Sequence, residues 1–99
     1  MDKEKLINDV RGKCYITDSS PEISSRLKML IEDAIVKLGE QIGAPKEFDY
    51  SKAGLEHDLF INYCFYSWND KANEFLPNYL SDVLLVRHKF EVINHAKQE

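Results

Sequence analysis

The stretch "SSPEISSRLKMLIEDAIVKLGEQIGAP", residues 19–45, decides the fold class because it has the features of one long helix. Its apolar residues recur every three or four positions, which places them on one face of an α-helix for about five turns. They are Ile23, Leu27, Leu30, Ile31, Ala34, Leu38 and Ile42. Because such a face has to be buried against other elements, the stretch predicts a long amphipathic helix inside a helical bundle.

Both ends of this helix carry local signals. Ser19 with Glu22 fits a capping box, whereas Ser20 with Pro21 fits an N-cap followed by proline at the first helical position. The sequence leaves these two starts open. At the other end, Gly43 and a proline two residues later indicate termination, since glycine favours the position just past a helix and proline cannot continue one.

The stretch "LEHDLFINYCFYSW", residues 55–68, predicts another helix that begins near residue 54 and ends near residue 68. Most of its sides are apolar, so it is either the central helix of a bundle or a helix with a second face committed to a partner. We interpret its aromatic residues mainly as core. In the loop before it, Phe48 and Tyr50 are expected to tuck back against the bundle.

Two further helices complete the prediction. Apolar spacing at i, i+1 and i+4 predicts a short N-terminal helix that Gly12 can end, with Leu6, Ile7 and Val10. The last helix contains Pro77, which removes a hydrogen bond and clashes with the preceding turn, so we expect a kink or a new helix start there. We therefore predict an all-α fold in a single domain, residues 1–99. It is a small bundle of about four helices: a short N-terminal helix, two long central helices and a long C-terminal helix.

Composition indicates a globular chain that is not inserted in a membrane. The hydrophobic fraction of 43 % is ordinary for a globular domain. No apolar run approaches the ~20 residues that span a bilayer. The N-terminal "MDKEKLINDV" is charged and lacks the apolar stretch of a secretory signal. We expect the chain to stay inside the cell that makes it, or in a particle assembled there.

The charge distribution disfavours tight binding to nucleic acid. The net charge is −4, and between Leu38 and Val86 eight acidic residues face three lysines, a balance of −5. A single-strand binder joins aromatic residues to a basic groove, but here the aromatic residues lie in the acidic half. The third helix also has no lysine or arginine from Leu55 through Asp70, which disfavours a DNA-reading helix-turn-helix domain.

Residues that support catalysis or metal binding do not occur at suitable spacing. Cys64 has its nearest histidine, His57, seven residues earlier, about two helical turns away. His88 and His95 are equally far apart, too far to chelate one metal ion without other ligands, and are interpreted as surface residues. Cys14 and Cys64 are expected to be free and buried. We predict no catalytic residue, no cofactor and no metal site, hence no enzyme.

Two long stretches, "LINDVRGKCYITDSSPEISSRLKMLIEDAIVKLGEQIG" and "LEHDLFINYCFYSWNDKANEFLPNYLSDVLLVR", carry a resemblance to a known family. The order is a short helix, an Ile-Thr-Asp connector, a long helix, a polar loop, a third helix, a polar "ND" break and a final helix. This order resembles the head–tail connector (adaptor) family of tailed bacteriophages. The resemblance covers Leu6 to Arg87, and Pro77 departs from the family's pattern.

The resemblance implies a structural virion protein without enzymatic activity. Copies would form a ring, a dodecamer in the virion, docked beneath the portal protein at the head–tail interface after assembly in the host cytoplasm. The ring would extend the DNA channel, with DNA only as passing cargo, and would seat the next head-closure or tail-completion protein. A closed ring needs two different complementary patches on each subunit, and the third and last helices can supply them.

The last thirteen residues, 87–99, form a candidate docking tail. Arg87, Phe90 and Ile93 are its candidate partner-docking residues, because the apolar side chains can anchor a mobile end that has basic flanks. The tail would dock on the portal or on a neighbouring subunit. The alternative is that Phe90 and Ile93 finish the core helix. An alternative for the whole chain is a small helical regulatory or partner-binding protein, also without enzymatic activity.

Overall fold

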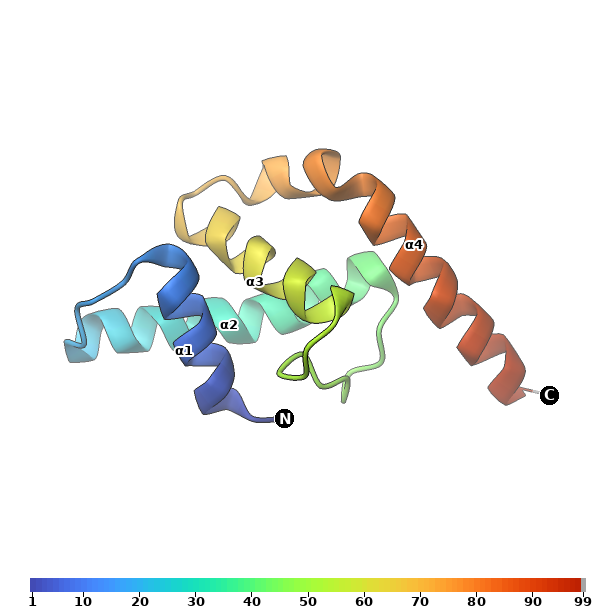
Figure 1. Ribbon diagram of the computed structural model, residues 1–99, viewed down its shortest axis with the longest axis horizontal. Helices are drawn as coiled ribbons and strands as arrows, with labels where there is room; N and C mark the ends of the chain where they lie inside the picture. The colour runs from blue at the N-terminus through green and yellow to red at the C-terminus, as the bar shows by residue number, and fades with distance from the viewer. Residues whose placement is uncertain (99) are drawn as a thin grey trace.

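The computed structural model describes residues 1–98 and has four helices and no strand in that range. The helices are α1 (Lys3–Cys14), α2 (Pro21–Ile42), α3 (Leu55–Trp68) and α4 (Ala72–Gln98). α3 contacts all three other helices, and Figure 1 shows it between α2 and α4. The predicted all-α bundle of four helices is confirmed, with α3 as its central helix.

Backbone chemistry fixes the two ends of α2. Ser20 is the N-cap, and its hydroxyl oxygen accepts a hydrogen bond of 3.4 Å from the backbone N–H of Ile23. Pro21 follows at the first helical position, so the helix uses the second of the two predicted starts. Gly43 ends the helix in the left-handed conformation (φ 72°), which glycine adopts without steric cost, and its N–H donates to Gly39 O.

The first helix extends past its expected end. Gly12 lies inside α1, which continues to Cys14, so the expectation that Gly12 ends the helix is wrong. A glycine inside a helix costs only about 0.5–1 kcal/mol, and Cys14 beyond it packs against the core. Tyr15 ends the helix instead, in the left-handed conformation (φ 56°), with its N–H donating to the carbonyl oxygens of the last turn.

The core is built around α3, as its aromatic residues predict. Phe60 and Cys64 are fully buried, and no residue of α3 is among the exposed large apolar side chains of the described chain. Tyr50, from the loop before α3, is buried and stacks on Phe60 with 4.8 Å between ring centroids. Phe48 packs edge-on against Tyr50 at 4.9 Å. The prediction that this loop tucks back against the bundle is confirmed.

Proline bends the last helix. Two residues after Pro77, Tyr79 has φ −118° and ψ 18°, outside the helical region. This is the predicted kink, and the helix then resumes and runs to Gln98. In Figure 1 the first part of α4 crosses the top of the molecule and the second part descends to the C-terminal end. Within residues 1–98 no helix combines the length and apolarity needed to cross a membrane.

Candidate functional site

α4 carries apolar side chains on two sides. The side that faces the core buries four of them, Phe75, Val83, Val86 and Phe90. Six other large apolar side chains of the same helix are at least 38 % exposed: Leu76, Leu80, Leu84, Leu85, Val92 and Ile93. α4 therefore presents more apolar surface than the rest of the described chain covers.

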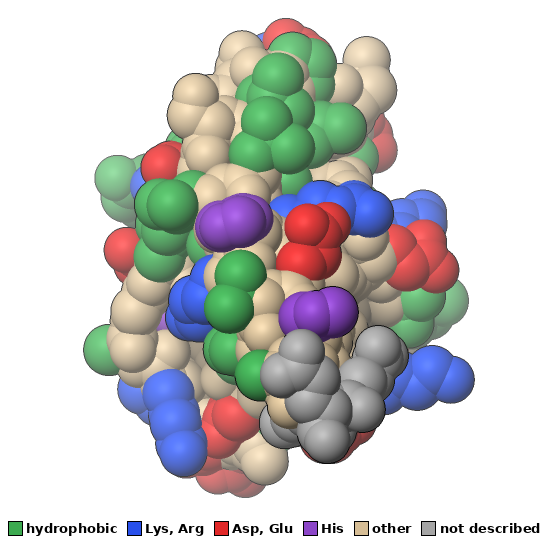
Figure 2. Space-filling model, turned by 90° about the vertical axis from the view of Figure 1, so that its right-hand side faces the viewer, with side chains coloured by type: hydrophobic (Ala, Val, Ile, Leu, Met, Phe, Trp, Pro, Cys, Tyr) green, Lys and Arg blue, Asp and Glu red, His purple; other side chains and the backbone are tan. Residues whose placement is uncertain are grey.

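Four of these exposed residues form one surface, the outer face of α4, which consists of Leu80, Leu84, Leu85 and Val92. At about 100° of rotation per residue, Leu84, Leu85 and Val92 lie on the side of the helix turned away from the buried valines, and Leu80 lies on the flank between the two sides. Figure 2 shows hydrophobic side chains gathered at the top of the molecule, where the first part of α4, before the kink, crosses it in Figure 1. Because contiguous exposed apolar surface marks contacts with other macromolecules, the outer face of α4 is the candidate functional site.

The three predicted docking residues have different surroundings. Arg87 belongs to the fold, since its Nη1 donates to Gln41 O at the end of α2 over 3.1 Å. Phe90 is 5 % exposed and packs edge-on against Phe48, with 5.2 Å between ring centroids, so for this residue the core alternative applies. Ile93 is 39 % exposed and remains accessible. The segment after Val86 continues α4, and Glu99 lies outside the described residues.

A second surface feature is a hollow of about 690 Å³ at the C-terminal end of α2. It exists because small residues line it, and a Cβ on Gly39 would lie 3.4 Å from the buried Tyr50 Oη. Glu40 and Lys46 also line it, and neither makes an ion pair with a side chain of residues 1–96. The apolar lining, together with this acid and this base, defines the α2 hollow: Ile35, Val36, Gly39, Gly43, Ala44 and Pro45.

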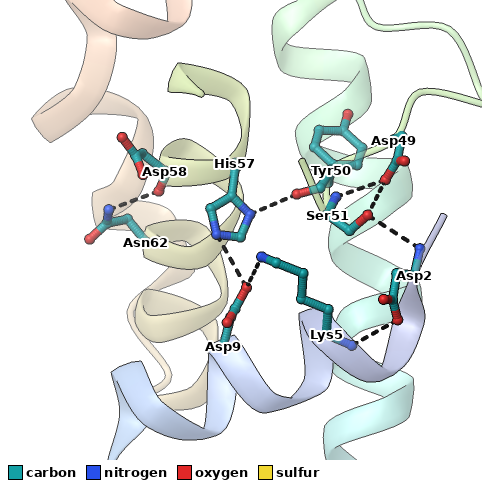
Figure 3. A network of polar contacts seen from close by, with 9 residues as sticks. All are labelled: Asp2, Lys5, Asp9, Asp49, Tyr50, Ser51, His57, Asp58 and Asn62. Carbon is teal, nitrogen blue, oxygen red and sulfur yellow. Dashed lines mark hydrogen bonds and ion pairs between the residues drawn. The ribbon is translucent and has the colours of Figure 1, made fainter. Parts of the chain in front are cut away.

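A polar network joins α1 to α3 and to the loop before it (Figure 3). Both ring nitrogens of His57 are engaged: Nδ1 lies 2.7 Å from Tyr50 O, and Nε2 lies 3.4 Å from Asp9 Oδ2. Lys5 Nζ contacts the same carboxylate at 2.7 Å. Sequence reasoning considered His57 only beside Cys64, because its partner Asp9 is 48 residues away and no local pattern connects the two.

The serine of this network is not paired with the histidine. Ser51 Oγ donates to the carboxylate of Asp49 and accepts a hydrogen bond of 3.2 Å from the backbone N–H of Asp2. A serine nucleophile needs a base that takes its proton, and here His57 bonds to other groups. The network therefore fastens the start of the chain and the loop to α3, and its geometry is not that of a Ser–His pair.

The two thiols are shielded rather than activated. Cys64 is fully buried, and this burial raises the pKa of its thiol far above the ordinary value. Cys14 is half-buried, and desolvation also raises its pKa, although Lys13 opposes the shift. A thiolate is the reactive form, so both groups are poor nucleophiles at neutral pH. Both cysteines are free.

Among residues 1–98, no three histidine, cysteine or acidic side chains gather closely enough to hold a metal ion. His88 and His95 are exposed, as predicted from the sequence. The outer face of α4 and the α2 hollow instead offer apolar area with a few charges. Comparisons of the chain with family models, with curated proteins and with solved structures find no match.

Proposed function

We propose that this chain is a structural virion protein of a tailed bacteriophage, a head–tail connector subunit that acts by assembly and not by catalysis. Copies form a ring beneath the portal protein, extend the DNA channel and seat the next head-closure or tail-completion protein. The observation that carries the proposal is the exposed apolar outer face of α4. Burying one such side chain contributes about 1.5–3 kcal/mol, so assembly explains why the chain keeps four of them on one face.

Two distinct surfaces support a ring over a simple pair. A closed ring of identical subunits uses heterologous contacts, in which one patch meets a different patch on the neighbour. The outer face of α4 lies on the side of that helix turned away from the core, whereas the α2 hollow lies on α2 and the loop after it. One subunit can therefore offer both surfaces at the same time.

The charge distribution supports a channel through which DNA moves. The chain has a net charge of −4, and residues 38–86 alone carry −5. Phosphates are repelled by an acidic surface, so a lumen lined by this part of the chain would not hold the duplex. The proposal therefore needs no DNA-binding site, and DNA is cargo rather than a ligand.

The test is assembly with the portal protein encoded by the same genome. Size-exclusion chromatography with light scattering should give a complex of portal and several copies of this chain, and electron microscopy should show a ring below the portal. A Leu84→Glu, Leu85→Glu variant should lose the complex. Met29→Glu is the matched control, because Met29 is 70 % exposed on α2 outside both surfaces and its replacement should leave the complex intact.

The opposite results are also informative. A chain that forms a stable closed dimer and ignores the portal would contradict the connector proposal and favour a small regulatory or partner-binding protein. Loss of the complex in the Met29→Glu control as well would show that added charge, rather than the outer face of α4, decides the outcome.

A further inference from the structure

The most exposed large apolar side chain of α4 lies between two charged groups. Leu85 is 62 % exposed, with Asp82 three residues before it and His88 three residues after it. Residues spaced by three lie on one side of a helix, and a rise of 1.5 Å per residue puts about 9 Å between the two flanking positions. Neither Asp82 nor His88 makes an ion pair with a side chain of residues 1–96. We name these three residues together with Val92 the Leu85 ridge.

The α2 hollow has the matching arrangement of apolar and charged groups. Its small lining residues leave about 690 Å³, enough for a few apolar side chains. Glu40 and Lys46 are its acid and base, without an ion pair among the described side chains, and they are also six residues apart in sequence. Val36, 58 % exposed, adds apolar surface. An apolar ridge with one acid and one imidazole therefore complements an apolar hollow with one base and one acid.

We propose that the Leu85 ridge of one copy of this chain docks into the α2 hollow of the next. Leu85 and Val92 enter the hollow, Asp82 pairs with Lys46, and a ring N–H of His88 donates to the carboxylate of Glu40. The proposal rests on the function proposed above only in requiring that copies assemble. It adds which two surfaces meet, and the contact runs head to tail because the two surfaces are different.

The hollow is not filled by the helix of its own subunit. Within one chain, α4 turns its valines toward the core and Arg87 toward the end of α2, so Leu85 points away from the body. A two-fold contact between two α4 helices would bury the leucines but would leave Glu40 and Lys46 unpaired at an empty hollow. The head-to-tail contact buries the ridge and satisfies both pairs of charges.

Mixing two blocked variants separates the head-to-tail contact from the two-fold contact. Leu85→Glu blocks the ridge and leaves the hollow intact, whereas Val36→Glu blocks the hollow and leaves the ridge intact. Both residues are exposed, so both variants should keep the helical circular dichroism of the wild type. Sedimentation velocity at concentrations up to about 1 mM, where a contact of about −4 kcal/mol is half formed, should show concentration-dependent association of the wild type. Each variant alone should associate at least tenfold more weakly.

The equimolar mixture gives the deciding result. It should contain a dimer of one copy of each variant and nothing larger, because only one intact ridge and one intact hollow remain. A mixture that stays as monomeric as its components, or a wild type that is monomeric at about 1 mM, overturns the proposal. Self-association of the Val36→Glu variant at the wild-type level also overturns it, since the outer faces of α4 would then pair with each other.

Reversing the charges tests the register of the contact. Asp82→Lys and Lys46→Asp should each weaken association severalfold, and a chain with both changes should recover most of the wild-type affinity. A chain with Asp82→Lys and Lys52→Asp has the same net charge and should not recover, because Lys52 lies outside the hollow. Equal recovery in both double variants would show that only net charge matters and would overturn the assigned pairs.

These results are separable from the test with portal. A ring on the portal without the mixed dimer would keep the connector function and refute this contact. The mixed dimer without any portal complex would keep the contact and refute the connector function.

Discussion

α3 and α4 differ in a way that runs against their sequences. α3 is apolar on most of its sides and carries the dense aromatic run, yet the described chain leaves none of its large apolar side chains exposed. α4 has a more mixed sequence and leaves six exposed. The apolar surface that a helix leaves exposed therefore depends on its neighbours in the bundle and not on its own hydrophobicity.

Position in the bundle explains the contrast. α3 contacts α1, α2 and α4, so each of its apolar sides meets another helix. Among the described residues, α4 contacts α2 and α3 but not α1, and it lies at the edge of the bundle (Figure 1), where one of its sides faces no other described helix. A central helix buries its apolar surface inside the subunit. An edge helix with two apolar sides buries one of them and leaves the other exposed, where another molecule can cover it.

The largest expected effect tests the two helices directly. Phe60→Ala in α3 should lower the free energy of unfolding by about 3–5 kcal/mol, because it leaves a cavity under Tyr50. Leu84→Ala on the outer face of α4 should change it by no more than about 0.5 kcal/mol. Urea denaturation at low protein concentration measures both. A loss above about 1.5 kcal/mol for Leu84→Ala would mean that the monomer itself uses this face.

Shortening α4 from its C-terminal end tests which of its residues the fold needs. A chain ending at Val86 loses Phe90 from the core and the contact of Arg87 with Gln41, so its free energy of unfolding should fall by about 3 kcal/mol or more. A chain ending at Glu91 keeps both groups and should lose less than about 1 kcal/mol. Thermal unfolding followed by circular dichroism compares the two. Equal stability of both chains would show that the fold does not need the residues from 87 onward. That result would favour the interpretation of this segment as a docking tail.

Local signals made much of this fold predictable. Pro21 and Gly43 mark the ends of α2 through backbone geometry that depends on the residue itself, and Pro77 bends α4 for the same reason. The apolar composition of α3 left two interpretations open, a central helix or a helix with a second face committed to a partner, and its contacts with the other three helices decide for the first. The prediction that Gly12 ends α1 was wrong because a single glycine only weakens a helix. The helix continues to Cys14, which packs against the core.

The candidate site was less predictable because it depends on distant pairs. Phe90 is buried because Phe48, 42 residues earlier, lies beneath it, and no spacing in the sequence shows that contact. His57 and Asp9 meet across 48 residues in the same way. The exposed leucines of α4 could have been noticed as a second apolar side of the last helix. The packing of α2 and α3, however, determines which of the two apolar sides of α4 is buried.

The stability of the core around α3 is expected to depend on pH through the buried Cys64. Burial raises the pKa of Cys64 from its ordinary value of 9.0, so the folded chain holds this proton at a pH where the unfolded chain releases it. The contribution to stability is complete below pH 9 and is lost as pH rises above it, by at most about 1.4 kcal/mol per pH unit. Urea midpoints between pH 7 and 11 measure the decline, and Cys64→Ala should make it shallower. An unchanged slope would show that other groups cause the alkaline loss.

The smallest expected effect concerns the loop that covers α3. Tyr50 is 1 % exposed, and its hydroxyl oxygen has no hydrogen-bond partner among the described side chains, while burial raises its pKa to about 12. A buried hydroxyl without a partner costs free energy, so Tyr50→Phe should keep the stacking on Phe60 and raise the free energy of unfolding by up to about 1 kcal/mol. Tyr15→Phe is the control, because Tyr15 is 88 % exposed and should show no change. Destabilisation by Tyr50→Phe would show that the hydroxyl is satisfied in solution, by water held against Gly39. The loop that packs on α3 would then enclose a bound water molecule at the Tyr50 hydroxyl.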